Sequence, residues 1–414
     1  MYFDLYKHCV LNKNVIYDLL CSKQYLIEKE MLEILQLFIE HEKAEVLVKR
    51  YGEESLKKFQ EFFIRNNLGE FCDELHGRER ISSLNDYIVN LHDIAPFKLE
   101  QVVLELTGKC NLNCDFCSSE TTIYRSCGCK KWKYDRFMDD EKYIELADEI
   151  IALRPDTVIF SGGEPLLKKQ LLIKLVEKFV KESISCKVYT NGELMDEHIL
   201  NKFIENKVDI YWQMVANSND KYKIITKSRL NFNTIYDKVK KYINMGGNVV
   251  VSLLICKEND ENISEMESFL KNNNLQYFKS FIYPPNKSVS TKYYKQSISC
   301  ENKRNLCVNV QNYDYLKRFN ACLVDSIFIS ENGGVYPCMM LRKFELGSLF
   351  DKKLYQIFRE DRHYKFWQLS KSSVQYCEDC GYNIVCQDCR ALEYQATGII
   401  NGMHYCEKLG DENV

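Results

Sequence analysis

The stretch VVLELTGKCNLNCDFC, residues 102–117, joins a short apolar segment to three closely spaced cysteines. Val102–Leu106 has the composition of a buried β-strand. The loop after it carries Cys110, Cys114 and Cys117 in the spacing C-x3-C-x2-C, which lets three thiolates converge on one compact soft-metal centre. A four-iron cluster needs four ligands. This motif would therefore leave one iron open to a ligand from outside the protein.

Downstream of this loop, short apolar segments alternate with amphipathic ones. Five further strands are expected at Thr157–Phe160, Cys186–Tyr189, Val208–Trp212, Val249–Ile255 and Gln276–Ile282. Helices are expected between them, for example at Asp139–Leu153, Leu171–Glu182 and Thr234–Met245. Six βα units in series require parallel strands joined by right-handed crossovers. The expected fold is therefore α/β, a partial (β/α)6 TIM barrel with its chemistry at the carboxyl ends of the strands.

Polar and glycine residues follow the second and third of these strands. Ser161, Gly162, Gly163 and Glu164 end the second strand, and Asn191 follows the third. Two glycines let a cofactor approach the backbone closely, and bare N–H and C=O groups can bind a zwitterionic amino acid. An ordinary glycine turn, and an ordinary turn asparagine, are the alternatives.

The cysteine motif, with the aromatic Phe116 directly before its third cysteine, resembles that of the radical S-adenosylmethionine (SAM) enzymes. The resemblance implies that the three cysteines hold a [4Fe–4S] cluster whose open iron is chelated by the amino and carboxylate groups of SAM. Reductive cleavage of the sulfonium would then give a 5′-deoxyadenosyl radical. The alternative is a structural zinc loop that takes a fourth thiolate from Cys127 or Cys129.

The same resemblance extends to the ends of the second and third strands. Ser161, Gly162, Gly163 and Glu164 are similar to the family's GGE motif, which contacts the amino group of the methionine part of SAM. Asn191 lies in a segment that resembles one near SAM. These five residues are the expected SAM-binding residues.

Seven cysteines after residue 320 form a second array: Cys322, Cys338, Cys377, Cys380, Cys386, Cys389 and Cys406. Their layout resembles the SPASM extension of peptide- and protein-modifying radical SAM enzymes, which carries two auxiliary four-iron clusters. The family has three residues between the cysteine pair that closes its central run, whereas this chain has two, Gln387 and Asp388. Zinc ribbons also use paired C-x2-C motifs, so zinc is the alternative.

The resemblance also implies which cysteines hold which auxiliary cluster. Cys322, Cys338 and Cys389 would hold the first, and Cys377, Cys380, Cys386 and Cys406 the second. Members with a fully ligated first cluster have another cysteine a few residues before the position of Cys322. The nearest upstream thiol here is Cys307, so the first cluster has either an open iron or Cys307 as its fourth ligand. The expected cofactors are SAM and three [4Fe–4S] clusters.

Residues 1–95 are expected to form a module of their own. Strands are predicted at Tyr2–Leu11 and Val15–Leu20, helical faces follow from Met31 to Phe38 and from Leu56 to Phe63, and Gly69 is the expected helix cap. This order suggests a winged-helix-like domain, although any small α+β domain would produce it. In peptide maturases, a leader-recognition (RRE) module of this kind captures a precursor peptide by strand addition. The expected domains are 1–95 for peptide recognition, 96–300 for the radical SAM barrel and 301–414 for the auxiliary clusters.

The composition is that of a globular protein with an excess of cysteine. A net charge of −3 gives no basic field to recruit nucleic acid. No signal peptide or membrane-spanning apolar stretch is visible, so a cytoplasmic location is expected, where disulfides are rare. The odd count of 19 cysteines, clustered at short spacings, then favours metal. Outside the clusters, the thiols expected in the core are Cys9, Cys21, Cys72, Cys186 and Cys256.

The preferred function is that of a radical SAM peptide maturase, which abstracts hydrogen from a ribosomal precursor peptide and installs a thioether or carbon–carbon cross-link. The peptide and an electron donor such as flavodoxin or ferredoxin are the expected partners; nucleic acid and a membrane are not. A peptide epimerase and a multi-zinc scaffold are alternatives. A third is an anaerobic sulfatase-maturing enzyme that forms formylglycine. That group places Asp directly after the cysteine matching Cys338, where this chain has Met339.

Overall fold

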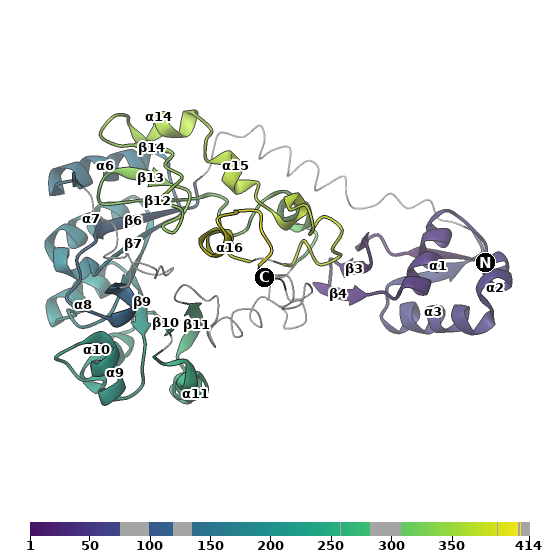
Figure 1. Cartoon of the computed structure of the whole chain (residues 1–414), viewed down its shortest axis with the longest axis horizontal. Helices are drawn as coiled ribbons and strands as arrows, with labels where there is room; N and C mark the ends of the chain where they lie inside the picture. The colour runs from purple at the N-terminus through teal and green to yellow at the C-terminus, as the bar shows by residue number, and fades with distance from the viewer. Residues whose placement is uncertain are drawn as a thin grey trace. The chain divides into compact units, whose positions relative to one another are not determined.

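The computed structural model describes residues 1–74, 99–118, 135–256, 258–281, 308–386, 388–404 and 406. The chain divides into two compact units, each assembled from distant segments (Figure 1). The N-terminal unit comprises Met1–Pro96, Ile298–Ala321 and Gln368–Asp388. The barrel unit comprises Phe97–Ser297, Cys322–Trp367 and Cys389–Val414.

Six parallel strands form the centre of the barrel unit. They are β6 (Gln101–Thr107), β7 (Thr157–Gly162), β8 (Ser185–Thr190), β9 (Asp209–Met214), β10 (Val249–Ile255) and β11 (Gln276–Phe281). Each strand pairs in parallel with the next one along the chain. The predicted parallel sheet is therefore confirmed, except that Ile282 lies outside the described residues.

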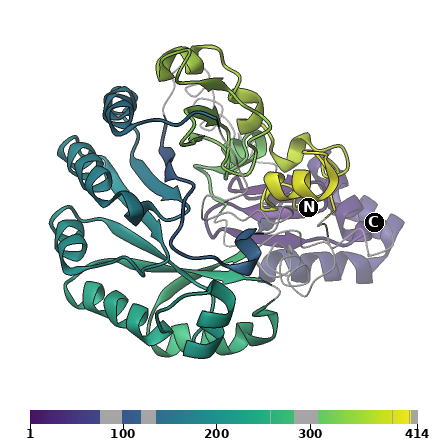
Figure 2. The same ribbon diagram turned by 60° about the vertical axis from the view of Figure 1, so that its left-hand side comes forward.

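The helices between these strands lie on the convex side of the curved sheet (Figure 2). They are α6 (Asp140–Ala152), α7 (Lys169–Lys181), α8 (Glu197–Glu205), α9 (Asn219–Thr226), α10 (Phe232–Asn244) and α11 (Ile263–Asn272), with short 3-10 turns at η1 (Pro165–Lys168) and η2 (Asp260–Asn262). Asp139 caps α6, because its carboxylate accepts the Lys142 amide at 2.8 Å. The buried face of α6 is the predicted one, formed by Tyr143, Leu146, Ala147 and Ile150.

Three short strands that the sequence did not predict extend this sheet beyond β6. They are β12 (Ser326–Ile329), β13 (Gly334–Tyr336) and β14 (Gly347–Ser348). β12 runs parallel to β6, and β13 and β14 continue antiparallel. The remaining helices of the barrel unit are α5 (Asp115–Ser118), α14 (Leu354–Arg359), α15 (Tyr364–Trp367) and α16 (Arg390–Thr397). The first part of the cysteine-rich region thus continues the barrel sheet.

The N-terminal unit combines two small sheets with three helices. Its elements are β1 (Tyr2–Leu5), β2 (Cys9–Asn12), β3 (Val15–Asp18), β4 (Lys23–Leu26), α1 (Lys29–Ile39), α2 (Ala44–Tyr51), α3 (Glu53–Arg65) and β5 (Gly69–Cys72), followed late in the chain by α13 (Tyr313–Arg318) and η3 (Lys371–Ser373). β1 pairs with β5, and β2, β3 and β4 form an antiparallel sheet. The predicted turn is present, with Lys13 at a φ of 56°. The predicted first strand is two strands, β1 and β2, which belong to different sheets.

Gly69 was predicted to cap a helix, and this prediction is wrong. α3 ends at Arg65, and the left-handed residue after it is Asn67, with a φ of 54°. Gly69 instead begins β5 opposite Leu5. A Cβ atom there would lie 2.4 Å from the Phe3 ring, so the glycine allows β1 and β5 to approach closely.

Two hydrophobic cores hold the N-terminal unit together. The first is rich in aromatic residues and includes the predicted helical faces, with Phe3, Phe38, Phe59 and Phe63 at most 3% exposed. The second joins β3 to late segments of the chain and comprises Val15, Tyr17, Leu19, Val308, Tyr313, Leu316, Ile384 and Val385. The Tyr17 hydroxyl also donates to the Gly381 carbonyl at 2.8 Å. The N-terminal strands therefore share a core with the segment that carries Cys377–Cys386.

The cysteines expected in the core are only partly placed there. Cys9, Cys186 and Cys256 are buried, as predicted, and Cys72 is half-buried. Cys21 is exposed, contrary to the prediction, because it lies in the turn between β3 and β4. Among the helices of the described ranges, none has the length and apolar character needed to cross a bilayer.

Candidate functional site

The three-cysteine loop follows β6 at the carboxyl edge of the sheet. Cys114 and Cys117 are buried, and Cys110 is half-buried. The Cys117 amide donates to the Cys114 carbonyl at 3.0 Å, in the turn that begins α5. The strand therefore delivers all three thiols within one short loop at the edge where parallel α/β sheets carry their chemistry.

N–H groups surround the Cys110 sulfur. The Leu112 amide donates to Sγ at 3.4 Å, and Nδ2 of Asn191 lies 3.8 Å from it. The same Nδ2 donates to Asn111 Oδ1 at 3.0 Å, which fixes the asparagine over the loop. N–H donors to sulfur stabilise a metal-bound thiolate and raise the potential of an iron–sulfur cluster. The donor set at Cys110 therefore fits a cluster ligand.

The glycines after β7 pack directly on this loop. The Gly163 amide donates to the Thr107 carbonyl at 2.7 Å, and the Glu164 amide donates to the Lys109 carbonyl at 2.8 Å. A Cβ atom at Gly163 would lie 2.2 Å from the Lys109 oxygen, and one at Gly162 would lie 2.3 Å from the Thr107 oxygen. The expectation of bare N–H groups at Gly163 and Glu164 is therefore wrong. These glycines admit the cysteine loop to the backbone of β7.

Ser161, at the end of β7, has a side chain that could bind a ligand. Its hydroxyl is buried and has no hydrogen-bond partner among the described residues. Ser161 and Ile159 lie on the same face of β7, because side chains alternate along a strand. Ile159 lines a cavity on that face. An unsatisfied buried hydroxyl costs free energy, so Ser161 fits a group that hydrogen-bonds a ligand.

The side chain of Glu164 holds the end of β7 to the end of β8. Its carboxylate accepts the Leu166 amide at 3.0 Å, the Thr190 hydroxyl at 2.8 Å and the Asn191 amide at 2.9 Å. Burial raises the pKa of Glu164 to about 7, and these three hydrogen bonds oppose that shift. Glu164 thus acts in this structure by positioning Asn191 over the cysteine loop.

Glu193, which the sequence analysis did not single out, is a further anchor of the loop. Its carboxylate accepts Nδ2 of Asn111 at 2.7 Å and the hydroxyl of Tyr222 at 3.3 Å, and it also accepts the Ser228 hydroxyl. A carboxylate directly after the Asn191-Gly192 pair, at a strand end, was the available sequence signal. Glu193 connects the cysteine loop to α9 and the residues after it.

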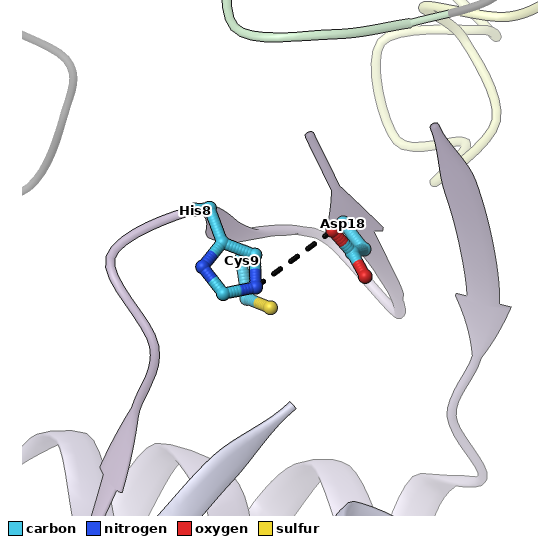
Figure 3. Close-up of side chains that lie close together, drawn as sticks. All are labelled: His8, Cys9 and Asp18. Atoms are coloured by element: carbon cyan, nitrogen blue, oxygen red, sulfur yellow. Dashed lines mark ion pairs between the residues drawn. The ribbon is translucent and has the colours of Figure 1, made fainter. Parts of the chain in front are cut away.

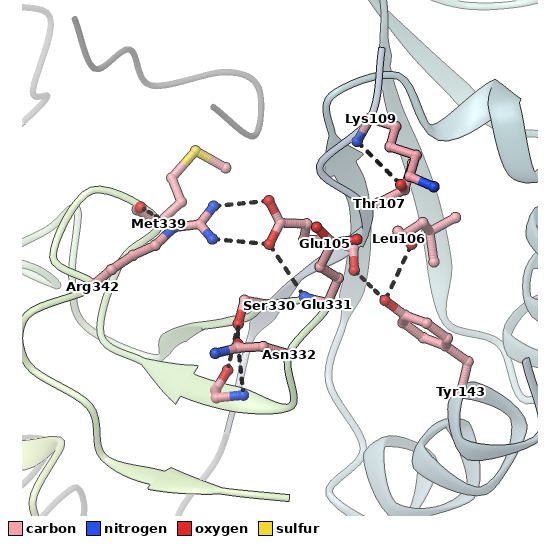
Figure 4. Close-up of polar contacts among 11 residues, drawn as sticks. Glu105, Leu106, Thr107, Lys109, Tyr143, Ser330, Glu331, Asn332, Met339 and Arg342 are labelled. Atoms are coloured by element: carbon pink, nitrogen blue, oxygen red, sulfur yellow. Dashed lines mark hydrogen bonds and ion pairs between the residues drawn. The ribbon is translucent and has the colours of Figure 1, made fainter. Parts of the chain in front are cut away.

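A buried ion pair fixes β6 just before the loop (Figure 4). Arg342 donates to both oxygens of Glu105, at 2.9 Å each, and the two side chains are 2% and 1% exposed. Arg342 also donates to the Met339 carbonyl at 3.0 Å, and the Glu331 amide donates to Glu105 at 3.2 Å. The Tyr143 hydroxyl donates to the Glu105 carbonyl at 2.7 Å. Residues 331–342 are thereby locked to the strand that leads into the cysteine loop.

Glu331 contacts the loop itself. Its carboxylate lies against the Gly108 backbone, because a Cβ atom at Gly108 would lie 2.6 Å from Glu331 Oε1. Burial raises the pKa of Glu331, and the hydrogen bond from Gly108 opposes the rise. The cysteine loop is thus held by carboxylates at both ends, Glu331 near Gly108 and Glu193 near Asn111.

A cavity of about 280 Å³ lies against the face of the barrel sheet that carries Ile159. Tyr189, Tyr211 and Phe278 line it, with the rings of Tyr189 and Tyr211 4.8 Å apart. Cys322 and Cys338 also line it. The structure therefore brings two of the predicted auxiliary-cluster cysteines to a cavity walled by aromatic residues of the barrel.

Cys389 and Cys406 lie at the two ends of one local structure in the barrel unit. Cys389 occupies the N-cap position of α16. The buried Arg390 donates to the carbonyls of Ile400 and Gly402, at 3.0 Å each, and so fixes the chain that returns toward Cys406. The Cys406 amide donates to the Met403 carbonyl at 2.9 Å.

Cys377, Cys380 and Cys386 belong to the N-terminal unit and lie on consecutive turns. The Cys380 amide donates to the Cys377 carbonyl at 3.0 Å, and the Cys386 amide donates to the Tyr382 carbonyl at 2.9 Å. Only two residues separate Cys386 from Cys389. One of them, Asp388, is buried and forms an ion pair with Lys371. Four residues that the sequence analysis discussed lie outside the described ranges: Cys127, Cys129, Cys307 and Gln387.

Two protein-family models match the chain. Residues 104–270 match the Radical SAM superfamily, and residues 322–381 match the iron–sulfur cluster-binding domain called SPASM. The chain therefore carries a radical SAM domain and a SPASM domain. Both domains were expected from the resemblance of the cysteine motifs, although the SPASM match ends before Cys386, Cys389 and Cys406.

The individual proteins that resemble this chain have low sequence identity to it. GTP 3′,8-cyclase of Synechocystis is 23% identical over 177 residues, which cover 42% of this chain and 51% of that protein. PqqA peptide cyclase of Granulibacter bethesdensis is 28% identical over 108 residues, which cover 26% of each chain. The matches thus span about half or less of these relatives. The structure of Streptococcus suis SuiB bound to precursor peptide SuiA superposes with a TM-score of 0.51 at 13% identity, covering 94% of this chain and 96% of SuiB. This likeness shows a shared fold.

The buried ion pair generates a first prediction. Arg342→Ala leaves the Glu105 carboxylate buried without its cation and should lower the free energy of unfolding by about 3–5 kcal/mol. The double variant Glu105→Gln/Arg342→Met should recover most of that loss, since no charge then remains buried. Chemical unfolding of the purified chain measures both. Asp140→Ala, which breaks the exposed pair with Lys168, is the control and should cost at most about 1 kcal/mol. Equal losses for Arg342→Ala and Asp140→Ala would contradict the role of the pair.

The raised pKa of Glu164 generates a second prediction. The pKa of Glu164 in the folded protein lies near 7, above its usual 4.5. The group therefore raises the free energy of unfolding below pH 4.5, and this contribution is lost as the pH rises through 7. The unfolding free energy of the wild type relative to Glu164→Gln should therefore fall by up to about 3 kcal/mol across that window. Calorimetry at several pH values measures the difference. The exposed Glu205→Gln is the control, and its difference from the wild type should stay flat.

Proposed function

Because this chain is an enzyme with a radical SAM domain and a SPASM domain, we propose that it is a peptide maturase. It abstracts a hydrogen atom from a residue of a ribosomal precursor peptide and installs a thioether or carbon–carbon cross-link. The observation that carries this proposal is the cavity of the barrel unit, where Cys322 and Cys338 share the walls with Tyr189 and Tyr211. The peptide specificity of PqqA peptide cyclase and the peptide bound to SuiB support a peptide as the substrate.

Cys110, Cys114 and Cys117 would hold the SAM-binding cluster, and Ser161, Gly162, Gly163, Glu164 and Asn191 would surround SAM. When bound there, SAM supplies a 5′-deoxyadenosyl radical after one-electron reduction by a donor such as flavodoxin or ferredoxin. In the chain itself, Asn191 and the Leu112 amide donate toward the Cys110 thiolate and lower its negative charge. The Ser161 hydroxyl is placed to hydrogen-bond a ligand. Glu164 acts indirectly, because its carboxylate fixes the position of Asn191.

The cavity suits a radical reaction on a peptide side chain. Tyr189, Tyr211 and Phe278 form an aromatic part of its wall, which would shield a reactive carbon centre from water on that side. Among the residues that the structure describes, no carboxylate lines the cavity, and Met339 occupies the place where formylglycine-forming enzymes carry an aspartate base. This lining favours cross-link formation over formylglycine formation.

The auxiliary cysteines complete the proposed cofactor set of three [4Fe–4S] clusters. Cys322, Cys338 and Cys389, all in the barrel unit, would hold the first auxiliary cluster, with Cys307 as a possible fourth ligand. The second would use Cys377, Cys380, Cys386 and Cys406. When bound, these clusters would supply an acceptor for the electron that the peptide radical must lose after bond formation. The proposed location of the protein is the cytoplasm.

Residues 1–95 are proposed to be a winged-helix-like domain that recognises the leader segment of the peptide, ahead of a barrel domain at 96–300 and a cluster domain at 301–414. In the three-stranded sheet, β2 and β4 are edge strands. An extended peptide can pair with such an edge while its side chains fill apolar sites. Leu26 on β4 is 53% exposed and offers such a site.

Replacing all three loop cysteines should abolish 5′-deoxyadenosine formation. The variant Cys110→Ala/Cys114→Ala/Cys117→Ala loses the ligands of one cluster, so iron should fall by about four atoms per chain. Anaerobic assays with dithionite and SAM, followed by chromatography, measure the product. Cys186→Ala removes a buried thiol of β8 outside the clusters and should keep both iron and cleavage. SAM cleavage at the wild-type rate in the triple variant would refute the radical SAM assignment.

The leader-binding edge is tested by a point substitution, because removing residues 1–95 would also strip Val15, Tyr17 and Leu19 from the core shared with Ile384. Leu26→Asp should weaken the affinity for the precursor peptide about ten- to a hundredfold, the effect of losing one buried leucine contact. Fluorescence anisotropy with a labelled precursor peptide measures it. Cleavage of SAM without peptide should not change.

Val46→Asp is the matched control for this experiment. Val46 lies on α2 of the same unit and is 49% exposed, similar to Leu26. Its substitution should leave the peptide affinity unchanged. Equal affinities for Leu26→Asp and the wild type would show that the leader does not bind at β4.

A further inference from the structure

His8, Cys9 and Asp18 of the N-terminal unit lie together at one end of the three-stranded sheet (Figure 3). One potential ligand atom from each lies within 4.8 Å of the others, and His8 Nε2 is 3.8 Å from Asp18 Oδ1. Cys9 and Asp18 are 4% and 3% exposed. The proposed reaction uses none of these residues, yet a thiol, an imidazole and a carboxylate are brought together in a largely buried corner.

The pairing of β2 with β3 creates this cluster. Cys9 is the direct cross-strand partner of Asp18 in the antiparallel register, so their side chains emerge on the same face. His8 immediately precedes β2, and its carbonyl accepts the Leu19 amide at 2.9 Å. The Tyr6 ring stacks on the imidazole at a centroid distance of 5.7 Å. The backbone and this stacking therefore hold three different ligand types toward one point.

Cys21 adds a fourth side chain that can bind a metal. It lies in the turn between β3 and β4, beside the Asp18 carboxylate. The turn is itself wrapped around Asp18, since the amides of Leu20 and Cys21 donate to Oδ1 at 3.1 and 3.0 Å. These two hydrogen bonds orient the Asp18 carboxylate through the backbone of the turn.

We propose that His8, Cys9, Asp18 and Cys21 form a binding site for a zinc ion, separate from the iron–sulfur clusters. Two thiolates, one imidazole nitrogen and one carboxylate oxygen are a donor set that suits four-coordinate zinc. Zinc bonds of about 2.0–2.3 Å place tetrahedral ligand atoms roughly 3.3–3.8 Å apart. The His8–Asp18 separation of 3.8 Å is a few tenths of an ångström longer than the roughly 3.3–3.4 Å expected for a nitrogen and an oxygen ligand. The Cys9 sulfur, within 4.8 Å of both other ligand atoms, would need to approach by about 1 Å at most, and the exposed turn that carries Cys21 would bring in the fourth ligand.

The charge balance of the site also favours a cation. Cys9 and the Asp18 carboxylate face each other in a buried position, where an uncompensated negative charge is costly. Zinc binds thiolates, so each cysteine releases its proton to solvent as the bond forms, and no oxidant or reductant is required. One divalent ion then lowers the charge of the carboxylate and the two thiolates from −3 to −1, and the remaining charge lies at the exposed, Cys21 side of the site.

Such an ion would crosslink three segments of a small sheet. It would join the residue before β2, the end of β3 and the turn leading into β4, whose outer edge is free for strand pairing in the described structure. Small domains with limited cores gain folding free energy from a bound metal. The zinc ion would therefore stabilise the strands proposed to receive the leader peptide, and it would do so whether or not they bind it.

The full-length, anaerobically purified chain with its clusters intact is the material for the test. Elemental analysis after growth with zinc should find about one zinc per chain beside the iron. Cys21→Ser and His8→Gln should each lose that zinc while the iron content stays at the wild-type level. Cys72→Ser is the matched control, because Cys72 is a half-buried thiol of the same unit outside the cluster, and it should retain zinc.

X-ray absorption at the zinc edge identifies the ligands without interference from iron. The wild type should show a mixed shell, with two sulfur atoms at about 2.3 Å and two nitrogen or oxygen atoms at about 2.0–2.1 Å. An all-sulfur shell would place the zinc on other cysteines and overturn the proposal. Absence of bound zinc, retention of zinc in both Cys21→Ser and His8→Gln, or a Cys9–Cys21 disulfide in the mass spectrum would each overturn it too. Because Cys21 is exposed, its substitution is compatible with folding, so zinc loss there reports on the site.

Discussion

The contact between the end of β7 and the cysteine loop after β6 is the constraint on which the active-site edge depends. Two backbone hydrogen bonds, from Gly163 to Thr107 and from Glu164 to Lys109, hold the loop against the strand. A side chain at Gly162 or Gly163 would overlap that loop, so the approach is possible only with glycine. The next strand is then added through the Glu164 carboxylate, which binds Thr190 and Asn191. Three consecutive strands thereby converge around Cys110.

An ion pair attaches the SPASM domain to β6, the strand that leads into the cysteine loop. Arg342 and Glu105 are 237 residues apart in the chain and form a bidentate pair beneath the loop. Removing either partner would leave a buried charge, so this pair fixes how the segment carrying Cys338 meets β6. β12 reinforces the link by pairing in parallel with β6. The cavity with Cys322 and Cys338 in its wall follows from these two attachments.

The sequence could predict what is local and periodic. The six barrel strands and the helices between them have continuous apolar patterns, and the cysteine loop is placed by the strand before it. The sequence could not predict β12, β13 and β14, because strands of two to four residues carry too little pattern. Nor could it predict the Glu105–Arg342 pair, which depends on a contact between distant segments. The core shared by Tyr17 and Ile384 was missed for the same reason.

For the candidate sites too, the sequence motifs revealed the residues but not the contacts that those residues make. The GGE residues were found by their motif, but the motif did not reveal that the Gly163 and Glu164 amides bind the loop. Cys9 was placed in the core correctly, yet its neighbours His8 and Asp18 became apparent only from the β2–β3 register. Side chains that meet across a hairpin, or across most of the chain, have no signature in the spacing of a single motif.

The most direct test of the central claim follows hydrogen from peptide to cofactor. The enzyme is incubated with SAM, a reductant and the precursor peptide carrying deuterium on its side chains, and both products are analysed by mass spectrometry. A peptide maturase transfers one deuterium to 5′-deoxyadenosine and yields a peptide that has lost two hydrogen atoms per cross-link. Formation of 5′-deoxyadenosine without deuterium, together with a peptide of unchanged mass, would contradict the account.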